Sequence, residues 1–165
     1  FSLDNYEDIF SDFDPRPFSE RGLSEDFLSE AKRACIDKYS EKINFLLIVP
    51  EKIRKSKEEE IIKERLKKHF KKHYTLLKKK KNRILKRGIS FWATGVIFMI
   101  IATIMLFKFK NENIISSFFT ILLEPAGWFL FWEGMHLVIF ETKKTNPTLQ
   151  FNERMANASI SFNSV

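Results

Sequence analysis

The sequence has 165 residues, a net charge of +7 and 44% hydrophobic residues, and its single cysteine excludes an internal disulfide framework. It has five glycines and three histidines, with no phosphate-binding loop, nucleophile motif or zinc spacing, and so predicts no enzyme, no cofactor and no metal site. The charge is unevenly placed: acids dominate residues 1–30, twelve Lys and Arg occupy 65–87 without an acid, and 88–140 carry few charges.

Residues 1–22 form an acidic N-terminal arm in which apolar side chains are interleaved with acids. The apolar residues fall at helical spacing, which predicts a short amphipathic helix from Asp4 to Phe13, ended by the prolines at 15 and 17. A disordered arm is the alternative, but the apolar residues favour a segment that docks on a surface. The acids of this arm are Asp4, Glu7, Asp8, Asp12 and Asp14.

Residues 23–50 predict a small unit made of a helix and a strand. Ser24 is a suitable N-cap for a helix that extends to residue 40. The following run INFLLIVP, residues 43–50, indicates a strand buried on both faces. One strand makes no sheet, so it must pair with another chain or with a strand that the sequence does not reveal. The first option favours a homo-oligomer.

Residues 51–87 contain no Gly or Pro and predict one long basic stalk helix. Ile62, Leu66 and Phe70 begin an apolar seam that continues to Ile84, a period of about 3.67 residues that suits a nearly straight helix packed on a neighbour. A solvated stalk is the plain interpretation, and binding of lipid head groups or nucleic acid would be an added role.

Residues 88–107 form a run of 20 residues without a charge. At 1.5 Å per residue such a helix spans about 30 Å, the thickness of a hydrocarbon core, which predicts transmembrane helix 1. Residues 108–113 predict a short external turn, and 114–140 a second crossing long enough to tilt or kink. The tail 141–165 is polar, and we expect Asn146-Pro147 to break its helix.

A basic cluster directly before the first crossing predicts the orientation. By the positive-inside rule, residues 1–87 and the tail lie in the cytoplasm and the short turn lies outside the cell membrane. The residues of the basic cluster are also expected to face lipid head groups. They are Lys78, Lys79, Lys80, Lys81, Arg83, Lys86 and Arg87.

The second crossing contains polar groups that lipid solvates poorly: Glu124, Glu133 and His136. At 100° per residue, Glu124 shares a face with Gly127, and Glu133 lies roughly opposite. Two interpretations stay open: carboxyls bonded between helices, or carboxylates that ring a water-filled pore in an oligomer. A metal site built from Glu124 and the Glu133-x-x-His136 pair is a third, which the lack of a second such motif disfavours. Gly127 and Gly134 permit close approach of a neighbouring helix, and Pro125 permits a kink.

The predicted fold is therefore a mainly α-helical membrane protein with a transmembrane hairpin, a basic stalk and a small αβα unit, assembled as a homo-oligomer in the lipid bilayer. This layout resembles that of the HalA-like membrane effectors of the Hailong anti-phage defence system. The likeness rests on the acidic segment LDNYEDIFSDFD, the strand INFLLIVP with the helix after it, and the two crossings. It covers most of the chain and is a likeness of layout.

The resemblance implies a tetramer in the cell inner membrane whose channel is blocked by the acidic N-terminal segments. It also implies an inhibitory DNA oligomer made by a partner nucleotidyltransferase. We therefore expect an oligomeric pore-forming effector of anti-phage defence that opens when the inhibitory nucleotide or DNA signal is lost. Two alternatives stay open: a non-conducting anchor or scaffold that binds acidic lipid or a protein partner, and a membrane-tethered nucleic-acid-binding protein.

Overall fold

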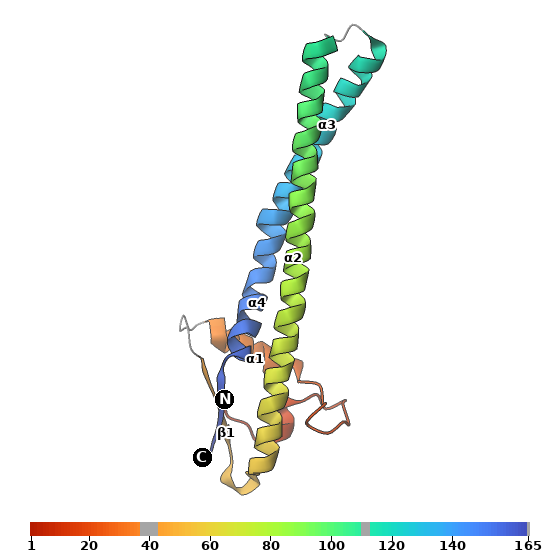
Figure 1. Cartoon of the computed structure of the whole chain (residues 1–165). Helices are drawn as coiled ribbons and strands as arrows, with labels where there is room; N and C mark the ends of the chain where they lie inside the picture. Colours follow the sequence, from red (N-terminus) through yellow and green to blue (C-terminus); the bar gives the residue numbers. More distant parts are fainter. Residues whose placement is uncertain (37–42, 110–112, 165) are drawn as a thin grey trace. The chain divides into compact units, whose positions relative to one another are not determined.

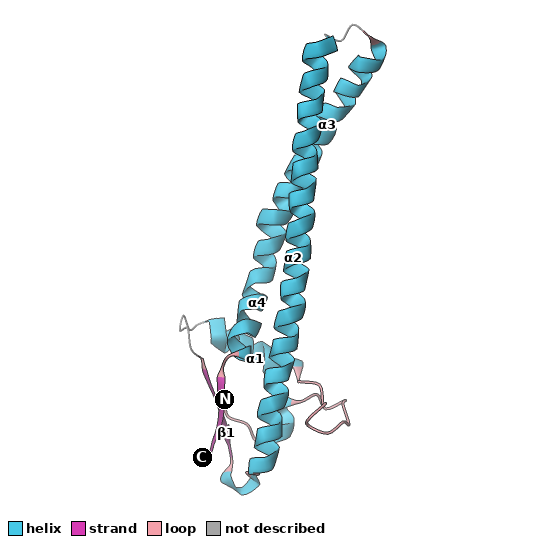
Figure 2. Ribbon diagram, in the orientation of Figure 1, coloured by secondary structure: helices cyan, strands magenta, loops and turns pink. Residues whose placement is uncertain are grey.

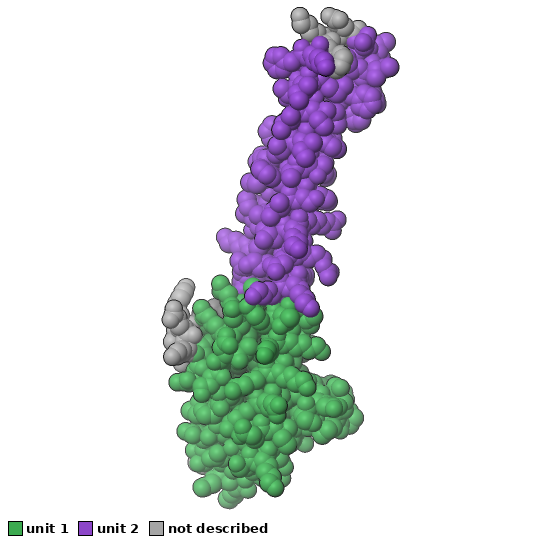
Figure 3. Space-filling view, in the orientation of Figure 1, with its two compact units in different colours: residues 1–76, 148–165 green, residues 77–147 purple. Residues whose placement is uncertain are grey.

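The computed structural model describes residues 1–36, 43–109 and 113–164. The chain is mainly helical, at 75%, and divides into two compact units (Figure 3). Unit 1 comprises residues 1–76 and 148–165, and unit 2 comprises residues 77–147. Figure 1 labels the α-helices and β1, and Figure 2 colours helices and strands differently. In chain order the elements are η1 (Tyr6–Ile9), α1 (Glu25–Ile36), β1 (Asn44–Val49), η2 (Glu51–Ile53), α2 (Ser56–Phe109), α3 (Ile114–His136), η3 (Leu137–Glu141), α4 (Thr142–Ala156) and β2 (Ser159–Ser164).

The strand predicted at 43–50 finds its partner within the chain. β1 pairs in parallel with β2, and Phe45 lies opposite Ile160 in the register. On its other edge, the amide of Ile48 donates to the carbonyl oxygen of Phe1 (2.7 Å), and that of Leu3 donates to Ile48 (2.9 Å). β1 therefore lies between the first residues of the chain and a strand from the tail. The unpaired strand no longer argues for a homo-oligomer.

The expectation that this strand is buried on both faces was wrong. Burial alternates along β1: Phe45, Leu47 and Val49 are buried, whereas Asn44 and Leu46 are exposed. The physical reason is that a two-stranded sheet packed on one side buries every second residue, whatever the hydrophobicity of the others. Leu47 and Val49 join the core of unit 1, which includes Phe70 of α2 and Met155 of α4.

The N-terminal segment is part of that core. Leu3, Tyr6, Ile9 and Phe10 are buried, so the docking surface expected for these apolar residues belongs to the chain itself. The α-helix expected from Asp4 to Phe13 is wrong, because only the single turn η1 forms. The Asp8 carboxylate accepts from the amides of Asp4 and Asn5 and so caps this turn, and a bridge from Phe10 to Leu23 then turns the chain away.

The long helices also differ from the expected boundaries. α2 joins the predicted stalk and first crossing into one helix, with Ile62, Leu66 and Phe70 fully buried in unit 1. The predicted break at Asn146-Pro147 was wrong, because Pro147 lies inside α4. The proline removes the hydrogen-bond donor for the carbonyl of Lys143, a residue exposed to solvent, so the helix continues. Residues 37–42 and 110–112 lie outside the described residues. They include the end of the helix predicted to extend to residue 40 and part of the predicted external turn.

Candidate functional site: the apolar helix pair

Two helices are long and apolar enough to cross a membrane, judged by length and composition: Ser56–Lys108 and Ile114–Ala156. Only 11% and 17% of their most apolar 18-residue windows are buried. The core helix of a soluble domain would bury most of such a window. The apolar side chains of this pair therefore need a covering that this chain does not supply by itself.

A seam of small residues brings α2 and α3 together in unit 2. Gly88, Gly95 and Ala102 of α2 are buried at seven-residue spacing. Gly127 and Gly134 of α3 continue the same pattern on the facing helix. A Cβ built on Gly95 would lie 2.6 Å from the carbonyl oxygen of Gly127, closer than real Cβ atoms approach. The two backbones are therefore in direct contact, a packing mode typical of membrane helices.

The prediction that Gly127 and Gly134 permit close helix approach is confirmed. Sequence reasoning missed their partners on α2, although Gly88 and Gly95 have the same seven-residue spacing as the α3 pair. A repeat of seven in both helices was the signal that could have found this seam. Pro125, expected to permit a kink, lies inside α3, which remains one α-helix from Ile114 to His136.

Glu124 lies at the edge of this seam. It lines a recess of about 190 Å³ between the helices with Met99, Ala102, Thr103, Leu106, Thr120 and Trp128. Both threonine hydroxyls donate within their own helices, Thr103 to the carbonyl of Met99 and Thr120 to that of Ser116. Within the described part of the chain, the Glu124 carboxylate has no hydrogen bond or ion pair.

The depth of Glu124 in a bilayer follows from its position in α3. It comes ten residues after Ile114, which is about 15 Å along the helix and half of a hydrocarbon core of about 30 Å. Glu124 would therefore lie near the middle of the membrane. It is exposed on the surface of the helix pair, so any covering must come from outside this pair.

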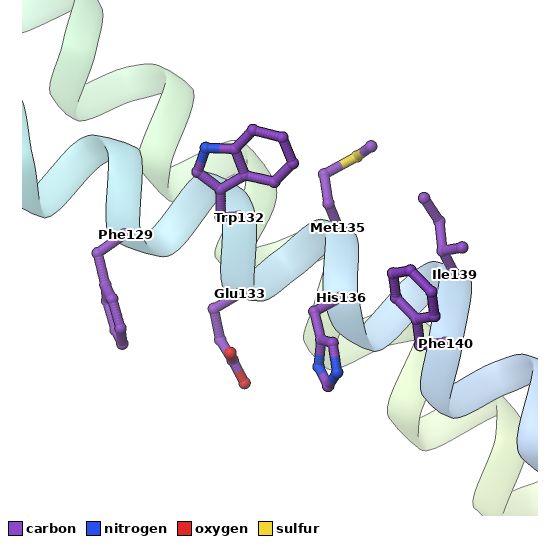
Figure 4. Close-up of a pocket in the computed structure, with 7 residues that line it drawn as sticks. All are labelled: Phe129, Trp132, Glu133, Met135, His136, Ile139 and Phe140. Atoms are coloured by element: carbon purple, nitrogen blue, oxygen red, sulfur yellow. The ribbon is translucent and has the colours of Figure 1, made fainter.

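Glu133 and His136 occupy a different part of α3. They point to the same side of the helix and line a recess of about 380 Å³ with Phe129, Trp132, Met135, Ile139 and Phe140 (Figure 4). The next residue, Gly134, packs on the carbonyl of Gly88, so Glu133 lies level with the start of the first apolar segment. Glu124 and Glu133 are nine residues apart, which turns them about 180° from each other. One helix pair therefore cannot direct both acids at one path.

Glu133 and His136 are also the residues considered for a metal site. Within the described residues no group of three His, Cys, Asp or Glu side chains could hold a metal ion. The Glu133-x-x-His136 pair supplies only two ligands. A metal site here would require residues from another copy.

α3 passes into α4 through the π-helical segment η3. The amide and the hydroxyl of Thr142 both donate to the carbonyl of Leu137, five residues earlier. The His136 ring stacks on the Phe140 ring, with 5.5 Å between centroids. π-Helical turns are rare, and those that occur inside α-helices are frequently found at functional sites. This one was not predicted from the sequence.

No family model, curated protein or solved structure matches this chain. The arrangement of charges around the helix pair must therefore carry the functional argument by itself.

The predicted basic cluster lies entirely on α2, directly before its apolar segment. All its members are exposed except Lys81, which is half-buried. The guanidinium of Arg87 lies 5.4 Å from the centre of the Phe91 ring, one turn further along the helix. The Arg87 side chain therefore reaches the first turn of the apolar segment.

The acids of the N-terminal segment lie in unit 1. Asp4, Glu7, Asp8 and Asp12 are exposed, whereas Asp14 is half-buried. The Arg16 guanidinium, and next the amide of Gly22, hold the pKa of the Asp14 carboxyl well below its usual range. Both donors lie 2.7 Å from the Oδ2 atom, and they close the neck of the loop 11–22. Asp14 therefore stabilises a loop, and the other four acids remain accessible to a partner.

Proposed function

We propose that this chain is one subunit of an oligomeric membrane channel and acts as a pore-forming effector. The observation that carries the proposal is the Glu124 carboxylate, which lies at mid-depth of an apolar helix pair and has no partner among the described residues. A charge at the centre of a bilayer costs on the order of 3 kcal/mol on insertion scales. Water inside a pore would remove most of this cost.

Two helices are too few to enclose water, so the pore needs several copies. A symmetric ring of subunits would place one Glu124 from each copy at the same depth. Rings of carboxylates are a common construction of cation pathways. Thr103 and Thr120 lie in the same recess as Glu124 and would add hydroxyl groups to the lining. Glu133, on the opposite side of α3, would then face a neighbour or the head groups.

The gating mechanism is the part of the proposal that rests on the resemblance. The resemblance to the HalA-like effectors also supplies the tetramer, the defence context, the inhibitory DNA oligomer and its partner nucleotidyltransferase. Within this chain, Asp4, Glu7, Asp8 and Asp12 are the exposed acids that could close a positively lined entrance. Because Leu3, Tyr6, Ile9 and Phe10 belong to the core of unit 1, the plug would be the acidic surface of a folded unit rather than a free arm.

Ion flux from liposomes tests this function. We expect the parent protein to conduct cations better than anions, and Glu124→Gln to bring the two permeabilities together. Glu64→Gln is the matched control, because Glu64 is exposed in unit 1 far along the sequence from the apolar segments. Neutralising the exposed acids of the N-terminal segment should raise flux without a trigger.

Two results would replace the proposal. Protein that assembles and inserts but conducts no more than empty liposomes would be a non-conducting anchor or scaffold. Conduction with unchanged selectivity in Glu124→Gln would remove Glu124 from the pore. A membrane-tethered nucleic-acid-binding protein, based on residues 65–87, would bind oligonucleotides whether or not it conducts.

A further inference from the structure

Three cations of the basic cluster share one face of α2. Lys80, Arg83 and Arg87 are spaced by three and four residues, which places them within about 60° of each other around the helix. All three are exposed, and none forms a salt bridge in the part of the chain that the structure describes. No acid occurs between residues 77 and 88. This stripe is therefore a concentrated positive surface beside the apolar segment.

The neighbouring helix does not neutralise the stripe. The neighbouring helical segments have two acids near this level, Glu133 and Glu141. Glu133 lines its own recess with His136 and forms no salt bridge among the described residues, whereas the Oε1 atom of Glu141 accepts a hydrogen bond from Lys144 at 2.8 Å. Lys80 and His136 lie close enough to interact electrostatically with the same carboxylate. Lys144 and Glu141 thus form an ion pair without net charge, which leaves the three charges of the stripe in excess. The site has an excess of positive charge.

The level of the stripe fits a lipid phosphate. Gly88, the residue after Arg87, packs against Gly134 near the end of α3 and against Val138 of η3. The boundary between hydrocarbon and head groups would therefore run close to Arg87. The Arg87 guanidinium lies over the Phe91 ring in a cation–π contact, and it has no hydrogen bond or salt bridge among the described residues, so its N–H groups can bind an anion.

We propose that Lys80, Arg83 and Arg87 form a binding site for the phosphate group of an acidic phospholipid in the leaflet at the Gly88 end of the apolar segment. Arg donors match phosphate oxygens in pairs, and Lys adds a point charge. Nucleic acid offers the same phosphate chemistry, but the position next to a 20-residue apolar segment favours a lipid. The inference needs the membrane placement assumed by the proposed function, but it needs no conduction.

Native mass spectrometry of the full chain in a neutral detergent tests the site. The probes are phosphatidylglycerol and phosphatidylcholine with identical acyl chains. The test variant is K80Q/R83Q/R87Q. The control K71Q/K78Q/K143Q removes the same charge from exposed positions, of which the two on α2 lie about 160–180° around the helix from Lys80. At about 1 kcal/mol for each basic residue near the surface, we expect the test variant to lose at least about tenfold in phosphatidylglycerol retention. The control should lose much less, and phosphatidylcholine retention should not change.

The conservative variant K80R/R83K/R87K should retain binding, and helix content by circular dichroism must match the parent. Equal losses in the test and control variants would mean diffuse attraction and would overturn the site. Competition by millimolar inorganic phosphate without lipid preference would assign the site to free anions. Displacement of the lipid by a single-stranded oligonucleotide that binds the parent more tightly would assign it to nucleic acid.

Discussion

Gly95 and Gly127 face each other across the helix pair so closely that a Cβ on Gly95 would lie 2.6 Å from the Gly127 carbonyl oxygen and from the Phe131 amide nitrogen. Backbone cannot move aside as a flexible side chain can. The contact thus fixes the separation of the two helices, and any larger residue must push them apart.

Gly95→Ala should therefore destabilise the helix pair. Overpacking costs about 1–3 kcal/mol, whereas the higher helix propensity of Ala alone would stabilise by about 1 kcal/mol. The two effects have opposite signs, so unfolding in mixed micelles with increasing dodecyl sulfate separates them. Thr94→Ala, on the neighbouring half-buried position, is the control and should change stability little. Stabilisation by Gly95→Ala would contradict the close contact.

The pairing of β1 with β2 makes the tail a structural part of unit 1. Phe162, opposite Leu47 in the register and 6% exposed, should cost about 3–5 kcal/mol when truncated to Ala. Ser161→Ala, on the exposed side of the same strand, should stay within about 0.5 kcal/mol. Denaturant unfolding of the full chain, followed by tyrosine and tryptophan fluorescence, measures both. Equal effects would mean that β2 is not packed.

A buried polar contact joins the N-terminal segment to α2. Glu59 accepts from both Arg54 donors, Nε to Oε1 at 2.9 Å and Nη2 to Oε2 at 3.0 Å, and from the Tyr6 hydroxyl at 3.0 Å. The amide of Lys55 donates to the same hydroxyl. Tyr6→Phe should cost about 1–2 kcal/mol, because the carboxylate and the amide each lose a partner. Phe13→Ala, at a fully solvated ring, is the control.

The same contact predicts a pH dependence. The Arg54 guanidinium, and further the Tyr6 hydroxyl, hold the pKa of Glu59 below its ordinary value of 4.5. A group whose pKa is lower in the folded state stabilises at neutral pH, and this contribution is lost as the pH falls below about 4.5 toward the folded-state value. Glu59→Gln should flatten this part of the stability curve between pH 5 and pH 3. An unchanged slope in the variant would assign the acid sensitivity to other carboxylates.

Topology is tested by labelling intact cells. In a Cys35→Ser background, cysteine at Asn113 should react with an impermeant maleimide, whereas cysteine at Ser159 should react only after lysis. Both positions are exposed, so accessibility within the chain does not bias the comparison. Labelling at Ser159 from outside would reject the hairpin orientation.

The sequence predicts the features that depend on long runs of one kind of residue. Twenty residues without a charge define a candidate span, and three apolar residues at helical spacing define the face of α2 that unit 1 buries. Gly127 and Gly134 could be assigned to a helix contact because small residues have few other uses in such a run. These inferences need no knowledge of distant parts of the chain.

The missed features depend on partners far away in the sequence. β2 has the sequence SISFNS, whose serines and asparagine give no strand signal until β1 lies beside it. The Asp4–Phe13 helix failed because Asp8 caps a single turn and because Phe10 pairs with Leu23. Pro147 stays inside α4 because the one carbonyl that loses its hydrogen-bond donor belongs to Lys143, which is exposed to solvent. Tertiary contacts decided each case.

β2 also determines when unit 1 can be completed during synthesis. Both apolar helices precede it in the chain, so a ribosome that releases residues in order must deliver the entire hairpin before the last strand of unit 1 exists. Until then β1 has an open edge, and Phe45 and Leu47 lack their neighbours. Unit 1 therefore stays incomplete until α3 and α4 have been synthesised, and its uncovered apolar residues are open to chaperones during this interval. The position of β2 in the sequence thus makes completion of unit 1 one of the last steps of chain synthesis.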